Sequence, residues 1–289
     1  MTERLDLGDI AAPMLLFGGP YGNRQALDAL FEHARRRGIP PARMLCTGDL
    51  AAYAADPQAV VDRIRDAGVT VVMGNVEESL GSAAADCHCG FEKGSECDLM
   101  AAQWYRYAVG AVTEDAKAWM QTLPRRVDFR LGGRRFAAIH GGVTQINRFV
   151  FPSTPDRDLD AELDAAACDA VIGGHSGLPF TRRIGARLWH NAGVVGLPAN
   201  DGTPRVWYSV LTPQADGIAV QIRALDYDHR AAAAEIRAAD LPAAYADSLE
   251  SGLWPTDDVM PDADRARRGL PLAPHDMIWP AESQSAAAD

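Results

Sequence analysis

The sequence lacks several features that would assign it to particular classes of protein. Its 289 residues contain no hydrophobic run that approaches the roughly 20 residues of a membrane-spanning helix. Its start, MTERLDLGDIAAP, lacks the charged beginning and long apolar run of a signal peptide. Basic residues are in deficit, with 28 Lys and Arg against 39 Asp and Glu. We therefore expect a soluble cytoplasmic protein with no membrane contact and no sequence-independent grip on nucleic acid.

Cysteine is scarce and odd in number, because the chain contains five: Cys46, Cys87, Cys89, Cys97 and Cys168. This count argues against a small disulfide scaffold. Three of the five fall in the segment DCHCGFEKGSEC, which has no C-x-x-C pair. A second metal site or a redox site could be built there from Cys87, His88, Cys89 and Cys97. A redox-sensitive loop, an isolated disulfide and free thiols are the alternatives.

The order of apolar and amphipathic segments indicates an α/β protein. Up to about residue 75, short apolar strands alternate with two expected helices. One lies at about 23–37, with Asn23 as its expected cap, and the other is DPQAVVDRIRDAG, with Pro57 at its first position and Gly68 at its end. This β-α-β-α-β order implies parallel strands with right-handed crossovers. Further helices are expected at about 100–123 and in the Ala-rich stretch 228–250, and RVDFRLGGRRFAAIH predicts two strands around a Gly-Gly turn.

The predicted domain organisation is simple. We expect a single domain over residues 1–250, with a Cys-containing insertion at about 81–99. Residues 251–289 are expected to be an extended, loosely packed C-terminal tail because they are rich in Pro, Asp and Ala. Its last residues, ESQSAAAD, are expected to be disordered.

Potential metal ligands follow several of the apolar strands. Parallel strands bring such turns together at the carboxyl edge of a sheet, where ligands usually bind. One carboxylate, one amide oxygen and two imidazoles are available there, from Asp49, Asn75, His140 and His175. This donor set suits Zn, Mn, Fe or Co better than Ca or Mg. Each residue taken alone could equally be an ordinary turn residue, a helix entry or a satisfied polar group.

The turns together resemble a known family, the calcineurin-like metallophosphoesterases, and most closely its small bacterial phosphodiesterase branch. That family's pattern is a D-x-H-G-N turn, a G-D turn, G-N-H-D/E, H-G, G-H-x-H and N-x-G-S-V-G-x-P-x-D-G. This chain has in the same order PYGN, TGDLAAYAADP, GNVE, HGG, GHSG and NAGVVGLPANDG, over roughly residues 14–247. The resemblance implies a four-layer α/β/β/α sandwich of two mixed sheets flanked by helices, divalent metals and phosphoester hydrolysis.

The departures from the family pattern concern one of its two metal sites. Gly19 and Tyr21 stand where the family has the Asp and His of the first site, and Gly177 stands where it has the second His of G-H-x-H. Val76 replaces the His that contacts the phosphoryl group and acts as general acid. The ligands that the resemblance implies for the second metal are all present: Asp49, Asn75, His140 and His175. The sequence thus predicts one strong site for Mn, Zn or Fe, or a rebuilt second site.

Other side chains could compensate for the losses. Tyr21 could bind a metal or a phosphoryl oxygen, or only fill the space of a lost imidazole. His190 could replace the missing acid, although strand alternation could turn it to the opposite face of the sheet. Glu77 and Glu78 could line the pocket, or form a solvated helix start.

The sequence therefore predicts a divergent metal-dependent phosphoesterase acting on a small phosphorylated or nucleotide-like substrate, with Asp49, Tyr21 and His190 as candidate catalytic residues. One alternative is a non-catalytic protein of this fold that binds a nucleotide or a protein partner. Another is a thiolate–metal or redox enzyme on the same scaffold. A homo-oligomer is possible on any of these readings.

Overall fold

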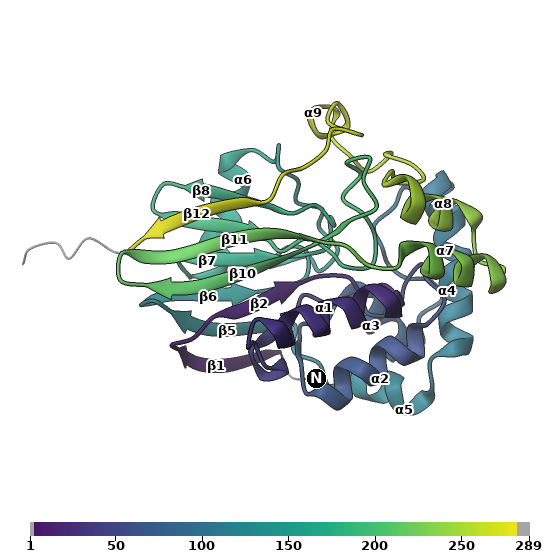
Figure 1. Ribbon diagram of the computed structural model, residues 1–289, viewed down its shortest axis with the longest axis horizontal. Helices are drawn as coiled ribbons and strands as arrows, with labels where there is room; N and C mark the ends of the chain where they lie inside the picture. The colour runs from purple at the N-terminus through teal and green to yellow at the C-terminus, as the bar shows by residue number, and fades with distance from the viewer. Residues whose placement is uncertain (1–2, 282–289) are drawn as a thin grey trace, which may run out of the picture.

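Two mixed six-stranded sheets dominate the computed structural model, which describes residues 3–281 (Figure 1). The expected disorder of ESQSAAAD concerns residues outside this range. Sheet I has the order β12-β11-β10-β2-β3-β4. Its strands are β2 (Met14–Phe17), β3 (Met44–Cys46), β4 (Thr70–Val71), β10 (Val206–Gln214), β11 (Gly217–Leu225) and β12 (His275–Pro280). As predicted from the sequence, β2, β3 and β4 are parallel.

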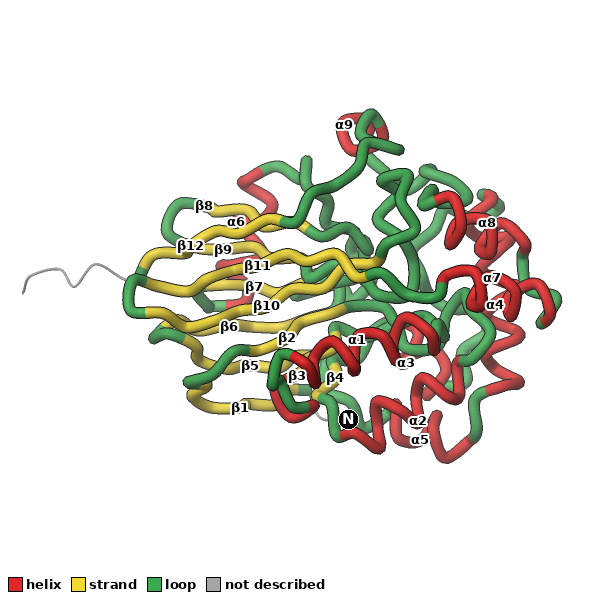
Figure 2. Tube along the Cα trace, in the orientation of Figure 1, coloured by secondary structure: helices red, strands yellow, loops and turns green. Residues whose placement is uncertain are grey.

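Sheet II has the order β1-β5-β6-β7-β9-β8. Its strands are β1 (Arg4–Ile10), β5 (Arg126–Leu131), β6 (Arg134–Ala138), β7 (Ala170–Gly173), β8 (Phe180–Ile184) and β9 (Arg187–Asn191). Strands β6, β7 and β9 run parallel, and β5 and β6 form the hairpin expected around the Gly-Gly turn. Figure 2 shows the helices gathered mainly on one side and at one end of the strands.

The helices are α1 (Arg24–Arg36), α2 (Pro57–Ala67), α3 (Asn75–Gly81), α4 (Glu96–Ala111), α5 (Glu114–Met120), α6 (Asp156–Ala166), α7 (His229–Ala238), α8 (Ala243–Ser251) and α9 (Asp262–Arg265). Helix α1 begins after Asn23, whose side-chain oxygen accepts a hydrogen bond from the Ala26 N–H. Helix α2 has Pro57 at its first position and ends at Gly68 with a φ of 69°. Both agree with the sequence-based expectation.

Strand alternation divides the core into layers. In β2, Leu16 points between the two sheets and packs in one cluster with Phe136 and Ile172 of sheet II, whereas Leu15 packs with the helices outside sheet I. Helix α6 covers the outer face of sheet II through Leu159. The resulting order is helices, sheet I, sheet II and helix, which confirms the expected architecture.

Two segments differ from the sequence-based expectation. Instead of one helix over about 100–123, the chain forms α4 and α5, because Thr113 accepts a hydrogen bond from the Ala116 N–H and begins a new helix. The C-terminal segment is not loosely packed throughout, because β12 pairs with β11 along six residues and Trp279 is buried. Within residues 3–281, no helix has the length and hydrophobicity to cross a membrane.

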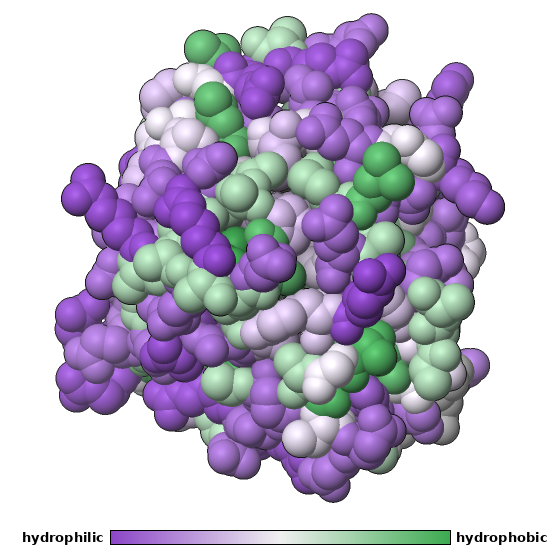
Figure 3. All heavy atoms as spheres, turned by 90° about the vertical axis from the view of Figure 1, so that its right-hand side faces the viewer, coloured by the Kyte–Doolittle hydropathy of each residue, from purple (hydrophilic) through white to green (hydrophobic). Residues whose placement is uncertain are grey.

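The end of the molecule that carries α4, α7 and α8 presents a largely hydrophilic face (Figure 3). Hydrophobic side chains gather on it in small groups between the charged ones. Two residues at this end, Met100 of α4 and Tyr245 of α8, line a hollow that also has Asp49 in its wall.

Candidate metal centre

The predicted metal ligands lie at the carboxyl ends of parallel strands from both sheets. Asp49 follows β3, and Asn75 begins α3, the next element after β4. His140 follows β6, and His175 follows β7. The turns of both sheets thus meet at one place. Ligands of α/β proteins usually bind at such carboxyl ends of strands.

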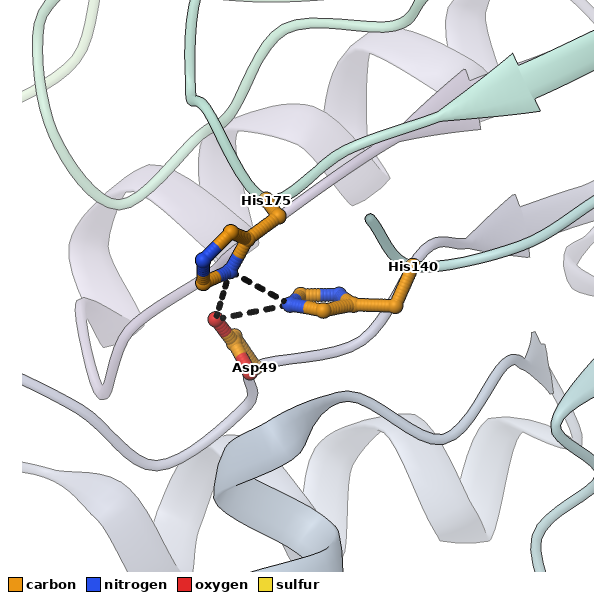
Figure 4. Close-up of side chains that lie close together, drawn as sticks. All are labelled: Asp49, His140 and His175. Atoms are coloured by element: carbon orange, nitrogen blue, oxygen red, sulfur yellow. Dashed lines mark hydrogen bonds and ion pairs between the residues drawn. The ribbon is translucent and has the colours of Figure 1, made fainter. Parts of the chain in front are cut away.

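The structure brings the four side chains close together, and Figure 4 shows three of them, Asp49, His140 and His175. His140 Nε2 lies 2.9 Å from Nδ1 of His175, 3.0 Å from Oδ1 of Asn75 and 3.3 Å from Oδ2 of Asp49. His175 Nδ1 lies 4.0 Å from the same Asp49 oxygen. Asp49, Asn75 and His140 are buried, and the side chain of His175 is 5% exposed.

The donor atoms fit a metal ion. His140 Nδ1 lies 2.6 Å from the Thr47 carbonyl oxygen, which can only accept, so Nδ1 carries the hydrogen and donates it. In its neutral form the ring directs the lone pair of Nε2 toward the oxygens of Asn75 and Asp49. Lone pairs that converge in this way repel one another unless a cation, either a proton or a metal ion, lies between them. Burial lowers the pKa of His140, but the Asp49 carboxylate outweighs it and raises that pKa, so Nε2 attracts a cation. Metal–ligand bonds of about 2.0–2.2 Å place neighbouring ligand atoms about 3 Å apart, as these are.

The electrostatics of the group also favour ligation. Burial raises the pKa of Asp49, but His140 and His175 outweigh it and hold that pKa below its usual value. Burial and the neighbouring His140 lower the pKa of His175 to about 3. The group therefore offers an ionised carboxylate and a neutral imidazole at neutral pH, which are the protonation states that bind metals.

Glu77 holds the site in shape. It is fully buried, and its carboxylate accepts hydrogen bonds from the backbone N–H groups of Asp49, Leu50 and Gly74 at 2.7, 2.7 and 2.9 Å. Asp49 has a φ of 62°, a left-handed conformation that this carboxylate stabilises. The interpretation of Glu77 as part of a solvated helix start is thus wrong, whereas Glu78 is half-buried and pairs with Arg125.

The signal for Glu77 was present in the sequence. Gly74 is the N-cap of α3 and Glu77 its third residue, which is the spacing of a capping box. What the sequence did not show is that the same carboxylate also reaches the turn after β3. Burial and the Asp49 carboxylate raise the pKa of Glu77 to about 7.

The cysteine-containing insertion lies against the metal centre. Cys87 and Cys89 form a disulfide, whereas Cys97 is free and buried. Asn75 Nδ2 donates to the Cys87 carbonyl oxygen at 2.9 Å and lies 3.5 Å from Sγ of Cys89. The ring of His88 forms a hydrogen bond with Ser79, with Nδ1 3.0 Å from Oγ. Among the described residues, the cysteines belong to no cluster of His, Cys, Asp or Glu side chains that could hold a metal. The four residues of the predicted second site are therefore not gathered as ligands.

Aromatic rings occupy the places that the resemblance assigns to the first metal's ligands. A Cβ atom added to Gly19 would overlap the ring of Tyr21, which is 4% exposed. A Cβ added to Gly177 would lie 3.5 Å from Cζ2 of Trp254. Burial and the Asp49 carboxylate raise the pKa of Tyr21 well above its ordinary value, so its phenol stays neutral.

His190 lies apart from the metal centre. It is fully buried on β9, and its Nδ1 lies 2.8 Å from Oγ1 of Thr181 on β8. Burial lowers its pKa to about 3. Val76, at the position of the family's general acid, is buried, and its backbone N–H donates to Oδ1 of Asp49 at 3.2 Å. The structure thus does not bring His190 to the place that the missing acid would occupy.

The fold and the donor set agree with the family to which the sequence points. The calcineurin-like phosphoesterase superfamily domain matches residues 22–215 of this chain. The chain therefore belongs to the calcineurin-like phosphoesterase superfamily.

Particular relatives cover most of the chain. The uncharacterized protein MJ0912 of Methanocaldococcus jannaschii is 25% identical over 240 residues, which span 77% of this chain and 90% of that protein. The metallophosphoesterase from Sphaerobacter thermophilus superposes with a TM-score of 0.66 at 20% identity, covering 84% of this chain and 100% of its own. The hypothetical protein PH1004 from Pyrococcus horikoshii OT3 gives 0.70 at 14% identity, with 84% and 99% covered. At these identities the two structures show a common fold.

Proposed function

We propose that this chain is a metal-dependent phosphoester hydrolase with one strong metal site, formed by Asp49, Asn75, His140 and His175. The observation that carries the proposal is the convergence of their donor atoms on His140 Nε2, within 3.3 Å, in a buried position. Membership of the phosphoesterase superfamily supports the reaction class. Placement in its small bacterial phosphodiesterase branch, with Mn, Zn or Fe as the metal and a small phosphorylated substrate, is part of the same proposal.

A single divalent metal supplies a Lewis acid for a phosphoryl oxygen and lowers the pKa of bound water toward about 7. The side chains of this protein supply fewer catalytic groups than those of a two-metal enzyme. Tyr21 lines the hollow beside Asp49 and, as a neutral phenol, can donate a hydrogen bond to a phosphoryl oxygen. The absence of an acid at Val76 costs about 10²–10⁴-fold for a leaving group that needs a proton.

The decisive experiment is metal analysis combined with turnover. We expect about one equivalent of Mn, Zn or Fe in the purified wild-type protein and metal-dependent hydrolysis of phosphodiesters. The variants Asp49→Asn and His140→Gln should lose both. His33→Gln is the matched control, because His33 bonds to Tyr208 on another part of sheet I and should keep metal and activity. Unchanged hydrolysis in the two site variants would contradict the proposal.

A non-catalytic role is the second candidate, and Tyr21 and Val76 favour it, since a buried neutral phenol and a buried valine stand where the family has reactive imidazoles. A protein of this kind would bind metal and a nucleotide or protein partner without turnover across a broad panel of phosphate esters.

A redox or thiolate–metal role would instead require the Cys87–Cys89 disulfide to open. Activity that is lost on changing Cys87 to Ser, with metal content unchanged, would favour that role. Light scattering would test the predicted possibility of a homo-oligomer.

A further inference from the structure

A hollow lined mainly by hydrophobic side chains opens beside the metal centre. Its free space is about 700 Å³ when the part open to solvent is counted. Asp49 and His175 form one part of its wall, so a molecule in the hollow would touch two of the candidate metal ligands. Its aromatic lining residues are Tyr21, Tyr53, Phe91, Phe149, Tyr245 and Trp254.

Most of these rings contact one another in two groups. The ring centroid of Tyr53 lies 4.7 Å from that of Tyr21 and 4.8 Å from that of Tyr245. On the other side, the ring of Phe149 lies 4.4 Å from that of His175. Trp254 is held in place by hydrogen bonds from its indole N–H to Pro198 and from its backbone N–H to Asn200. Flat apolar groups gain both burial and favourable ring–ring contacts in such surroundings.

The charge of the hollow limits what can enter it. Among its lining residues there is no lysine or arginine, whereas Asp49 contributes a carboxyl group to the wall. A polyphosphate would bring several negative charges next to this carboxylate with only one metal to balance them. A ligand with a single negative charge avoids this cost, since buried charges without partners are strongly disfavoured.

Val76 restricts the kind of leaving group, for a reason separate from the charge of the hollow. An alkoxide is a poor leaving group without a general acid, and Val76 supplies none. The oxygen of a phenol, with a pKa near 10, departs as an anion without being protonated first. The aromatic wall and the missing acid therefore favour the same chemical class of ester.

We infer that the hollow binds the aryl group of a monoanionic phosphodiester whose phosphoryl group lies at Asp49 and His175. This inference rests on the proposed function and names its substrate class. In the reaction, a water oxygen forms a bond to phosphorus and loses a proton to solvent. The bond between phosphorus and the aryl oxygen breaks, and its electron pair leaves on that oxygen. The products are a phosphate monoester and a phenolate, which takes up a proton from solvent.

Binding can be tested without turnover. The probes are methyl phenylphosphonate, which carries one charge and a ring, methyl methylphosphonate, which has the charge alone, and ATP, which has a ring system and several charges. We expect the Mn-loaded protein to bind the phenyl probe about tenfold more tightly than either of the others, by calorimetry. Trp254→Leu should reduce this preference to about threefold or less. Trp119→Leu, on α5 and outside the hollow, is the matched control and should keep it.

The outcomes separate this inference from the proposed function. Equal binding of the two phosphonates, or tighter binding of ATP, would overturn the aryl pocket. Equal metal-dependent hydrolysis of methyl phenyl phosphate and dimethyl phosphate would overturn it as well, and would leave the phosphoesterase proposal standing. A tenfold preference for the phenyl probe with no hydrolysis of either ester would support the pocket and contradict the proposed function.

Discussion

The ring of Tyr21 lies over Gly19 so closely that the glycine has no room for a side chain. Since Gly19 also has a φ of 23°, the turn after β2 has adapted its backbone to the phenol ring. In the family pattern the same two positions hold an Asp and a His. The place of the family's Asp is thus filled, and restoring an Asp at Gly19 alone would create a steric conflict with the Tyr21 ring.

A double-mutant cycle tests this relationship. Gly19→Ala should lower the free energy of unfolding by about 1–3 kcal/mol, because the new methyl group overlaps the Tyr21 ring. In a Tyr21→Ala background the same change should cost clearly less, since the ring is absent and only the backbone strain remains. Urea denaturation of the metal-free proteins measures both differences. Additive effects of the two substitutions would show that the ring does not occupy the space over Gly19.

Glu77→Gln should loosen the metal centre. An amide nitrogen cannot accept a hydrogen bond, so at least one buried N–H group of Asp49, Leu50 or Gly74 loses its partner, at a cost of about 1–3 kcal/mol. Because this carboxylate fixes the turn that carries Asp49, metal affinity should fall as well, by about tenfold or more. The neighbouring Glu78→Gln is the matched control and should change stability by about 0.5 kcal/mol or less. Similar losses in both variants would contradict the role given to Glu77.

The disulfide in the insertion should support metal binding through Asn75. The amide of Asn75 donates to the Cys87 carbonyl oxygen, so the closed loop fixes the orientation in which its Oδ1 faces His140. Changing Cys87 and Cys89 together to serine should weaken metal binding by about tenfold, as for other partners of metal ligands. Titration with Mn²⁺ measures this affinity, and Cys168→Ala, on the outer side of sheet II, is the control. An affinity that survives in the double variant would show that the loop holds its shape without the bond.

His190 should make the protein sensitive to acid. Its pKa is about 3 in the folded chain and 6.5 in the unfolded one, so the unfolded chain binds more protons between these values. Stability from this group is therefore complete above pH 6.5 and is lost as the pH falls toward 3. Between pH 7 and pH 5 the wild type should lose about 2 kcal/mol more than His190→Gln. Denaturant titrations of the metal-free proteins at both pH values test this, and equal losses would place the pKa of His190 near its ordinary value.

Local sequence signals predicted much of the fold. The strand ends before Asp49 and Asn75, the cap at Asn23 and the helix end at Gly68 are short-range features, and the structure agrees with them. Other features depend on contacts that local patterns do not record. Glu77 reaches a turn 28 residues away, and Trp254 enters the hollow from a segment that composition alone marked as a tail.

Strand β1 was also absent from the sequence-based prediction. It forms the edge of sheet II, and five of its seven residues are exposed. An exposed edge strand has little of the hydrophobic alternation that identifies strands in a sequence. Its pairing with β5 over Arg4–Ile10 is therefore visible only in the structure.

The position of β12 has a consequence for synthesis of the chain. A ribosome makes the chain from the N-terminus, so β11 exists for some time before residues 275–280 arrive to cover it. During that interval β11 presents a row of unpaired backbone groups, and such open edges recruit strands from other molecules. A chain that ends before residue 275 would leave this state permanent, and it would be prone to aggregate even though every residue of the metal centre is present.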